Sequence, residues 1–319
     1  MREGEAWPRI TVVTPSFNQG QFLEETIRSV LMQGYPNLEY IVVDGGSADS
    51  SLDVIKHYES WISYWVSEKD GGQAHAINKG FARATGSILA WLNSDDVYKP
   101  GAFVEVARSF SADSSIDVAY GSCESISEAS RCQAIHVPQQ FVLRDLLRSN
   151  FIAQPAAFFS RRVFDQIGLN QRHHYAFDYE LWIKAALRGY RFFRIPGAPL
   201  AGFRAWQQSK SETSYEKFVQ ETITIVAEAF GADTVPPRLR SMQNLALSSG
   251  WRFAALGYWR SGQGEKARGC LRQVFYLCPA SRIDIRLLVL FASTFFSKQV
   301  LRFLRNMKQA INRRRHALS

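Results

Sequence analysis

Two periodicities alternate along the first 120 residues of the chain. Short, almost wholly apolar runs predict strands that are buried on both faces of a parallel sheet. Between these runs, apolar residues recur at the three-to-four-residue spacing of an amphipathic helix. Strands are predicted at 10–14, 38–43, 64–67, 88–92 and 118–120, and helices at 22–31, 52–58, 73–84 and 100–110. This alternation is typical of an α/β fold, with a mainly parallel sheet sandwiched by helices.

The second half of the chain is less regular, and the pattern from 122 to 141 predicts no element. Further strands are predicted at 156–160, 190–195 and 200–204, and helices at 178–187 and 214–230. After a Gly- and Pro-containing boundary, apolar residues predict a helical hairpin that turns at 261–264. We therefore expect one domain over 1–230 and a helical C-terminal extension over 231–319.

Length and cysteine content limit the class of protein. A chain of 319 residues can bury one large core or two modest ones. The four cysteines show no metal-ligand spacing, which is typical of a reduced, cytoplasmic setting. Residues 1–9 have no apolar signal-peptide core, and no run reaches the ~20 apolar residues of a membrane span.

The net charge of +9 is concentrated at the C-terminal end. Nine basic residues after position 281 oppose Asp284 alone, so this tail carries +8 and the rest is nearly neutral. The basic residues are Arg282, Arg286, Lys298, Arg302, Arg305, Lys308, Arg313, Arg314 and Arg315. The charge of the main domain therefore gives no support to a nucleic-acid groove. Apolar runs between these charges predict an amphipathic helix on an anionic membrane surface, or a helix packed on the preceding domain with its basic face in solvent.

An acidic pair follows the predicted strand at 88–92. Asn93 and Ser94 lead directly into Asp95 and Asp96. Ligands of open α/β sheets bind beyond the carboxyl ends of the strands. Adjacent carboxylates repel each other and are best stabilised by a cation, such as a divalent metal with oxygen ligands. The alternative is that the pair only caps the next helix.

Three strand ends carry short polar loops, at 14–18, 44–47 and 93–96, and a parallel sheet would bring them to one edge. Asp44 could accept a hydrogen bond from a uracil or thymine imide, while Thr14 and Ser16 frame the base and ribose. No G-x-G-x-x-G follows the first strand and no P-loop motif occurs, which disfavours dinucleotide and P-loop folds. The loop at 14–20 also lacks the Gly-rich, basic character that a sugar nucleotidyltransferase would need.

The motifs at 11–18, 42–49, 76–80 and 92–96 occur in the order and spacing of family 2 glycosyltransferases. The chain resembles that family over about 9–210. The resemblance implies a GT-A fold, with a nucleotide-sugar-binding half at about 9–121 and an acceptor half at 122–210. It also implies an inverting transfer of a sugar from a nucleotide diphosphate, assisted by Mg²⁺ or Mn²⁺.

The resemblance further implies individual roles. The run 177–182 places Asp178 at the position of the general base, which an in-line displacement needs for the acceptor hydroxyl. Asp95 and Asp96 are the expected metal ligands. The expected donor-binding residues are Thr14, Pro15, Ser16, Asn18, Asp44, Gly45, Lys79, Asn93, Ser94, Asp95, Arg204 and Lys210. Asp178 could instead be a first-turn helix acid, and Lys79 a surface charge.

Two positions depart from the family pattern. Asn93 stands where many relatives have Asp, and Trp206 stands where they have His. Both departures predict weaker metal binding, with Arg204 or Lys210 assisting the diphosphate. They also leave open a non-catalytic nucleotide-sugar or carbohydrate-binding module. The favoured interpretation is a membrane-peripheral, cytoplasmic enzyme that uses a UDP- or dTDP-sugar and a saccharide or lipid-linked acceptor to build a bacterial-type surface polysaccharide or glycolipid.

Overall fold

A computed structural model describes residues 7–206, 209, 213–232 and 234–295. The chain forms two compact units, Met1–Glu221 and Thr222–Ser319. We predicted the division near residue 230; in the structure it lies earlier, inside helix α9 (Tyr215–Gly231).

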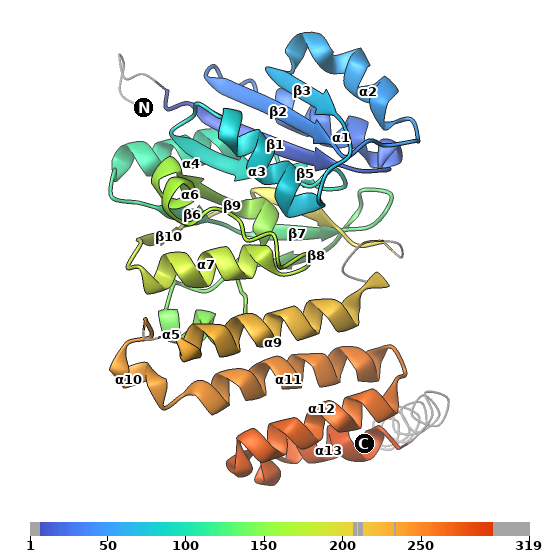
Figure 1. Cartoon of the computed structure of the whole chain (residues 1–319), viewed down its shortest axis with the longest axis vertical. Helices are drawn as coiled ribbons and strands as arrows, with labels where there is room; N and C mark the ends of the chain where they lie inside the picture. The colour runs from blue at the N-terminus through green and yellow to red at the C-terminus, as the bar shows by residue number, and fades with distance from the viewer. Residues whose placement is uncertain (1–6, 207–208, 210–212, 233, 296–319) are drawn as a thin grey trace, which may run out of the picture. The chain divides into compact units, whose positions relative to one another are not determined.

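A seven-stranded central sheet forms the middle layer of the first unit (Figure 1). Its strand order is β10-β6-β9-β4-β1-β2-β3. All neighbouring pairs are parallel except those made by β9, which runs antiparallel to both β4 and β6. The strands are β1 (Ile10–Ser16), β2 (Leu38–Asp44), β3 (Tyr64–Ser67), β4 (Ile88–Trp91), β6 (Val118–Tyr120), β9 (Ala157–Ser160) and β10 (Phe192–Arg194). The predicted mainly parallel α/β sheet is therefore confirmed.

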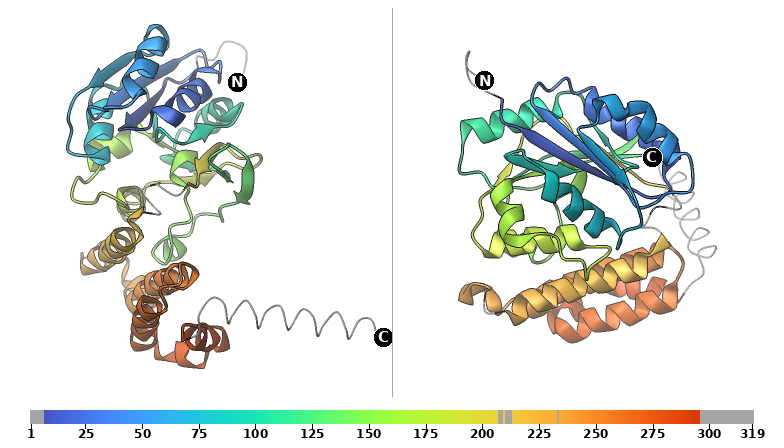
Figure 2. Two further views of the ribbon diagram at one scale, coloured as in Figure 1. Left: turned by 90° about the vertical axis from the view of Figure 1, so that its right-hand side faces the viewer. Right: turned by 45° about the horizontal axis from the view of Figure 1, so that its top comes forward.

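Helices cover both faces of this sheet, as Figure 2 shows from two further directions. Val12 packs with helices α1 (Gly20–Leu31), α2 (Ser51–Tyr58) and α4 (Ala102–Ala112) in one core. Its neighbour Val13 points to the opposite face, because side chains alternate along a strand. There it meets α3 (Gln73–Arg83) so closely that a Cβ on Gly80 would lie 2.5 Å from the valine.

Helices α6 (Arg161–Ile167) and α7 (Phe177–Leu187) lie on the α3 side of the sheet. Trp91 at the end of β4 stacks on Trp182 of α7, with ring centroids 6.0 Å apart. Phe81 of α3 packs against Phe164 of α6 at 4.9 Å. These rings fix α7 against the central strands and so place its N-terminus near their carboxyl ends.

A second, four-stranded sheet in the order β5-β11-β7-β8 corrects the prediction for 122–141. Strands β7 (Cys123–Ile126) and β8 (Cys132–His136) form a hairpin in the stretch where we predicted no element. Every residue of β8 is exposed, so this strand has no apolar alternation that a sequence pattern could detect. The remaining strands are β5 (Val97–Tyr98) and β11 (Ala201–Arg204), and short helical turns are η1 (Glu59–Trp61), α5 (Leu143–Leu146) and η2 (Gln154–Ala156).

The second unit is helical in its described part. It contains α10 (Pro237–Arg240), α11 (Gln243–Arg260), α12 (Gly264–Leu277), η3 (Pro279–Ile283) and α13 (Ile285–Ser293). Helices α11 and α12 lie side by side as the predicted hairpin (Figure 1). Within the described residues, no helix is both long and apolar enough to cross a membrane.

Candidate functional site

A cleft of about 1070 Å³ opens at the carboxyl ends of strands β1 to β4, entirely within the first unit. Loops that follow these four strands form one side of it. The residues before and at the start of α7 form another side, together with the end of β11. Among the predicted site residues, those that line it are Pro15, Ser16, Asn18, Gly45, Asn93, Ser94, Asp95, Asp96, Asp178 and Arg204. Asp178 and the acidic pair thus share one cleft although they are far apart in the sequence.

Asp96 is the more deeply buried member of the acidic pair, with 3% of its surface exposed. One carboxylate oxygen accepts the backbone N–H of Arg204 at 2.9 Å, and the other accepts the Asn93 amide at 3.2 Å. Burial and the neighbouring Asp95 charge raise the pKa of Asp96 well above its usual range. Burial also raises the pKa of Asp95. Negative charge at this position is therefore costly unless a cation offsets it.

Trp206 bonds directly to the acidic pair. Its indole Nε1 donates to Asp95 Oδ2 at 3.0 Å. The ring is steadied by Phe22 of α1, with centroids 5.0 Å apart in an edge-to-face arrangement. Trp206 therefore orients the Asp95 carboxylate by a hydrogen bond, whereas an imidazole in its place could have been a metal ligand.

The structure gives Arg204 a different place from the predicted diphosphate contact. Its side chain is 0% exposed and forms an ion pair with Glu25 of α1 at 2.7 Å. Its Nε donates to the Asp95 carbonyl at 2.7 Å. Its Nη1 donates to the β7–β8 turn, at the carbonyls of Ser127 and Glu128. These bonds commit the guanidinium to holding the acidic loop in place, so a direct role on the diphosphate is not supported.

Asn93 is bonded at both ends of its amide. Its oxygen accepts from Gln73 at 2.6 Å, and its nitrogen donates to Gln154 and to Asp96, each at 3.2 Å. Gln154 in turn donates to the Trp91 carbonyl at 2.8 Å. The amide thus connects α3, η2 and the acidic pair. A carboxylate at this position could not donate the two hydrogen bonds to Gln154 and Asp96.

Asp178 lies in the first turn of α7 and is half-buried. It accepts from the Asn150 amide at 3.2 Å. The preceding loop is held by Glu221 of α9, whose carboxylate accepts three consecutive backbone N–H groups. These belong to His174, Tyr175 and Ala176, at 2.8, 2.7 and 3.0 Å. The position of the candidate base therefore depends on a residue 43 positions later in the sequence.

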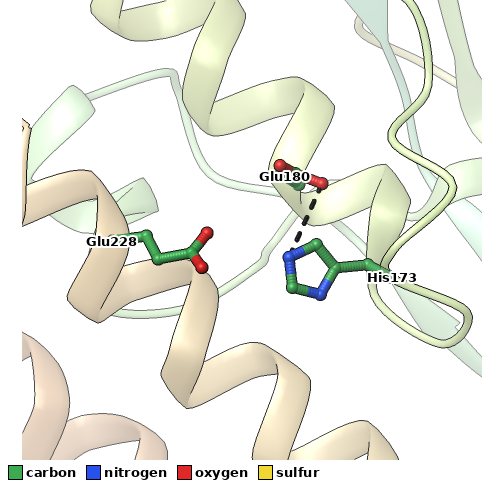
Figure 3. A group of neighbouring side chains, drawn as sticks. All are labelled: His173, Glu180 and Glu228. Atoms are coloured by element: carbon green, nitrogen blue, oxygen red, sulfur yellow. Dashed lines mark ion pairs between the residues drawn. The ribbon is translucent and has the colours of Figure 1, made fainter.

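Glu180, two residues along α7 and so on the other side of the helix, occupies a different environment from Asp178. It is 4% exposed and does not line the cleft. Lys184 pairs with it at 2.7 Å and Asn170 donates to it at 2.9 Å. The imidazole of His173 faces the same carboxylate, with Nε2 and Oε2 3.9 Å apart (Figure 3). This group supports α7 from behind the cleft.

Three predicted donor contacts do not line the cleft. Asp44 is fully buried, and its carboxylate accepts from Gly46, Ser47 and Ser67. Thr14 is also fully buried and bonds the Tyr40 hydroxyl at 3.0 Å. Lys79 forms an ion pair with Glu68. Direct donor contacts by Thr14, Asp44 and Lys79 are not supported by these positions, and Lys210 lies outside the described residues.

Residues at the ends of the first two strands also line the cleft. Ser16 is 4% exposed, lines the cleft, and its hydroxyl has no hydrogen-bond partner among the described residues. Asn18 adopts a positive φ of 51° and joins this loop to the next by accepting from Ala48 at 2.8 Å. A Cβ on Gly45 would lie 3.1 Å from Asp70 and 3.3 Å from Phe17, so glycine permits the close approach of both side chains.

Several residues of the site were missed by sequence reasoning. Phe17, Gln19 and Asn150 all line the cleft, but as single polar or aromatic residues in loops they carry no distinguishing signal. Glu221 gives no signal either, because it lies within an ordinary amphipathic helix. Only its hydrogen bonds in the structure reveal that it belongs to the site.

The residues at the acidic pair fit a hard divalent cation. Both carboxylates line the cleft, burial raises the pKa of each, and their oxygen atoms are the candidate ligands. Oxygen ligands of this kind suit Mg²⁺ or Mn²⁺. A cation would offset the charge that burial disfavours, and when bound it would stabilise the negative charge of a leaving diphosphate.

The fold is the GT-A fold, and solved structures share it. Staphylococcus aureus TarS 1–349 in complex with UDP-GlcNAc has a TM-score of 0.63 at 16% identity, covering 84% of this chain and 81% of that one. The mannosyltransferase PcManGT from Pyrobaculum calidifontis, in complex with GDP-Man and Mn²⁺, has a TM-score of 0.57 at 19% identity, covering 92% and 88%.

The family follows from sequence comparison. The glycosyl transferase family 2 model matches residues 11–168. An uncharacterized glycosyltransferase of Mycobacterium tuberculosis is 31% identical over 56% of this chain and 70% of its own length. The putative teichuronic acid biosynthesis glycosyltransferase TuaG of Bacillus subtilis is 28% identical over 66% and 84%. The chain belongs to glycosyl transferase family 2 and is a glycosyltransferase, as the motifs predicted.

Proposed function

We propose that this glycosyltransferase inverts the anomeric centre as it moves a sugar from a UDP- or dTDP-sugar to a saccharide or lipid-linked acceptor. The observation that carries the proposal is the shared cleft. Asp178 on one side and Asp95 with Asp96 on the other line the same space. One sugar diphosphate can therefore lie between a group that takes a proton and a group that holds a cation.

The donor occupies the part of the cleft formed by the strand ends. Pro15, Ser16, Asn18 and Gly45 line the end of the cleft that we assign to the nucleoside. Asn93, Ser94 and Asp95 line the diphosphate end, with Asp95 and Asp96 as ligands of Mg²⁺ or Mn²⁺. The Mn²⁺ in the mannosyltransferase complex is consistent with this use of a metal.

Asp178 acts as general base on the acceptor hydroxyl. Its hydrogen bond from Asn150 and the hold of Glu221 on the preceding loop orient the carboxylate towards the cleft. As the hydroxyl oxygen attacks the anomeric carbon, its proton passes to Asp178 and the bond to the diphosphate breaks on the opposite face. A single displacement of this kind inverts the configuration.

The acceptor belongs to a surface polysaccharide or glycolipid pathway at the inner face of the cell membrane. The name of TuaG, a putative teichuronic acid biosynthesis enzyme, supports a polysaccharide acceptor. The predicted basic tail supports a location at an anionic lipid surface, although residues 296–319 lie outside the described residues.

Thermal-shift measurements with UDP-, dTDP- and GDP-sugars, each with and without Mn²⁺, test the donor and the metal. We expect stabilisation by a UDP- or dTDP-sugar that disappears in chelator. NMR of the product formed from that donor tests the mechanism, with inverted anomeric configuration as the expected result. Retention of configuration, or stabilisation by every sugar nucleotide independently of metal, contradicts the proposal.

A further inference from the structure

Helix α13 in the second unit carries an exposed apolar stripe. Ile285, Leu288 and Val289 are 68%, 41% and 60% exposed, and Ala292 is exposed as well. Residues at this three-, four- and seven-residue spacing lie on one side of a helix. Three large apolar side chains on one side, all in solvent, are more than the isolated exposed residues that a protein surface normally shows.

The stripe is not the side by which α13 packs on its own unit. Leu287, which points roughly the opposite way, is 3% exposed. Phe291 contacts Phe275 of α12, with ring centroids 5.9 Å apart. Arg268 of α12 donates to the carbonyl of Thr294, just after the helix, at 2.7 Å. The helix is therefore anchored by its other side and its C-terminal end, and the stripe faces outward.

Two exposed arginines lie near the N-terminal end of the stripe. Arg282 and Arg286 are both exposed beside it. Asp284 is the single acid in the sequence from 278 to 295, and it caps α13 by accepting the N–H of Arg286 at 2.9 Å. Residues 296–319, which follow directly, add seven basic residues and no acidic one to the sequence.

We propose that the α13 stripe docks on the surface of an anionic lipid bilayer. Apolar side chains would enter the boundary between headgroups and acyl chains, while the flanking guanidinium groups pair with lipid phosphates. A second copy of the chain fits this surface less well, because pairing two stripes would bring the arginines of both copies together. The inference rests on the proposed function only in that a lipid-linked acceptor gives the docking a purpose.

Two leucines with the same exposure make a matched test. Leu288 in the stripe and Leu245 on α11 are each 41% exposed, so replacing either by Asp should leave the fold intact. The full chain is sedimented with vesicles of phosphatidylcholine alone, or of phosphatidylcholine with phosphatidylglycerol. We expect binding only to the anionic vesicles, reversed by salt. Leu288→Asp should lower the partition coefficient about tenfold, and Leu245→Asp should leave it unchanged.

Three results would overturn the inference. The wild-type chain fails to bind anionic vesicles, or Leu288→Asp binds them as well as the Leu245 variant does. Alternatively, light scattering shows a dimer that Leu288→Asp dissociates, which assigns the stripe to a second copy. Transfer to a water-soluble acceptor, measured on the same variants, reports on the enzymatic proposal separately. It should be equal in all three proteins, and its absence from all three would contradict the function and leave the vesicle result standing.

Discussion

Asp44 and Asp95 both follow the carboxyl end of a strand in the central sheet, yet they occupy opposite environments. Asp44 is fully buried and bonded by its own loop and by Ser67 of the adjacent strand. Asp95 is half-buried, lines the cleft, and takes a hydrogen bond from Trp206 far along the chain. A carboxylate at a strand end thus either holds its loop together or lines the cleft, and its hydrogen-bond donors decide which. Four substitutions can break or sharpen this contrast.

Asp178→Asn should have the largest effect, because it removes a cleft carboxylate that we assign to proton transfer. The amide keeps the shape of the side chain but has no useful basicity. We expect transfer to fall about 10³-fold. Donor affinity, measured by calorimetry, should stay within twofold of the wild type.

The control for this variant is Asp165→Asn on α6, an exposed acid outside the cleft. It should leave turnover unchanged. Equal turnover in the Asp178 variant and in this control would mean that the protein does not use Asp178 as its base.

Asp95→Asn should separate metal binding from stability. Losing one carboxylate should weaken Mn²⁺ binding about 10²-fold, as followed by calorimetry in the presence of UDP. Because burial raises the pKa of Asp95, its charge destabilises the metal-free fold at neutral pH, and the neutral amide should unfold at the same temperature or higher. A large drop in melting temperature would place Asp95 with Asp44, as a carboxylate that holds its loop.

Asp44→Ala should show the reverse behaviour. Four donor groups would lose their acceptor in a buried site, and we expect a loss of about 3 kcal/mol in the free energy of unfolding, measured with urea. Asp53→Ala on the exposed surface of α2 is the control and should change stability by less than about 0.5 kcal/mol. If the Asp44 variant unfolds like the wild type but binds no donor, the original prediction of a base contact is correct.

Trp206→Phe should give the smallest effect. It removes the hydrogen bond to Asp95 while an aromatic ring remains next to Phe22. Loss of this orienting bond should weaken Mn²⁺ binding about tenfold without a loss of fold. Trp206→His places a possible nitrogen ligand there and should restore or exceed wild-type affinity. Unchanged affinity in the Phe variant would show that Asp95 needs no orientation.

The sequence was sufficient for the central sheet with its helices and for the neighbourhood of the site. Apolar runs such as 88–92 report burial on two faces, and a parallel sheet brings their polar ends together whatever the details of packing. The sequence could not show that the Arg204 side chain is directed towards α1, because the same side chain on the same strand could equally reach the cleft. Nor could it detect β8, whose residues are all exposed and so carry no burial pattern. In both cases the sequence does not reveal which residues, far away along the chain, are the hydrogen-bond partners.

Because the Glu221 carboxylate fixes the loop before Asp178 by hydrogen bonds, it limits how far the protein can be truncated. The segment matched by the family model stops at residue 168, before Asp178, Trp206 and Glu221. A fragment trimmed to that segment would keep the strand ends that we assign to the donor but would lack Asp178, the base that we propose. A fragment that ends at residue 210 would keep Asp178 but lack Glu221. The backbone N–H groups of residues 174–176 would then lose their acceptor. The shortest version worth expressing for turnover therefore extends through the first turns of α9.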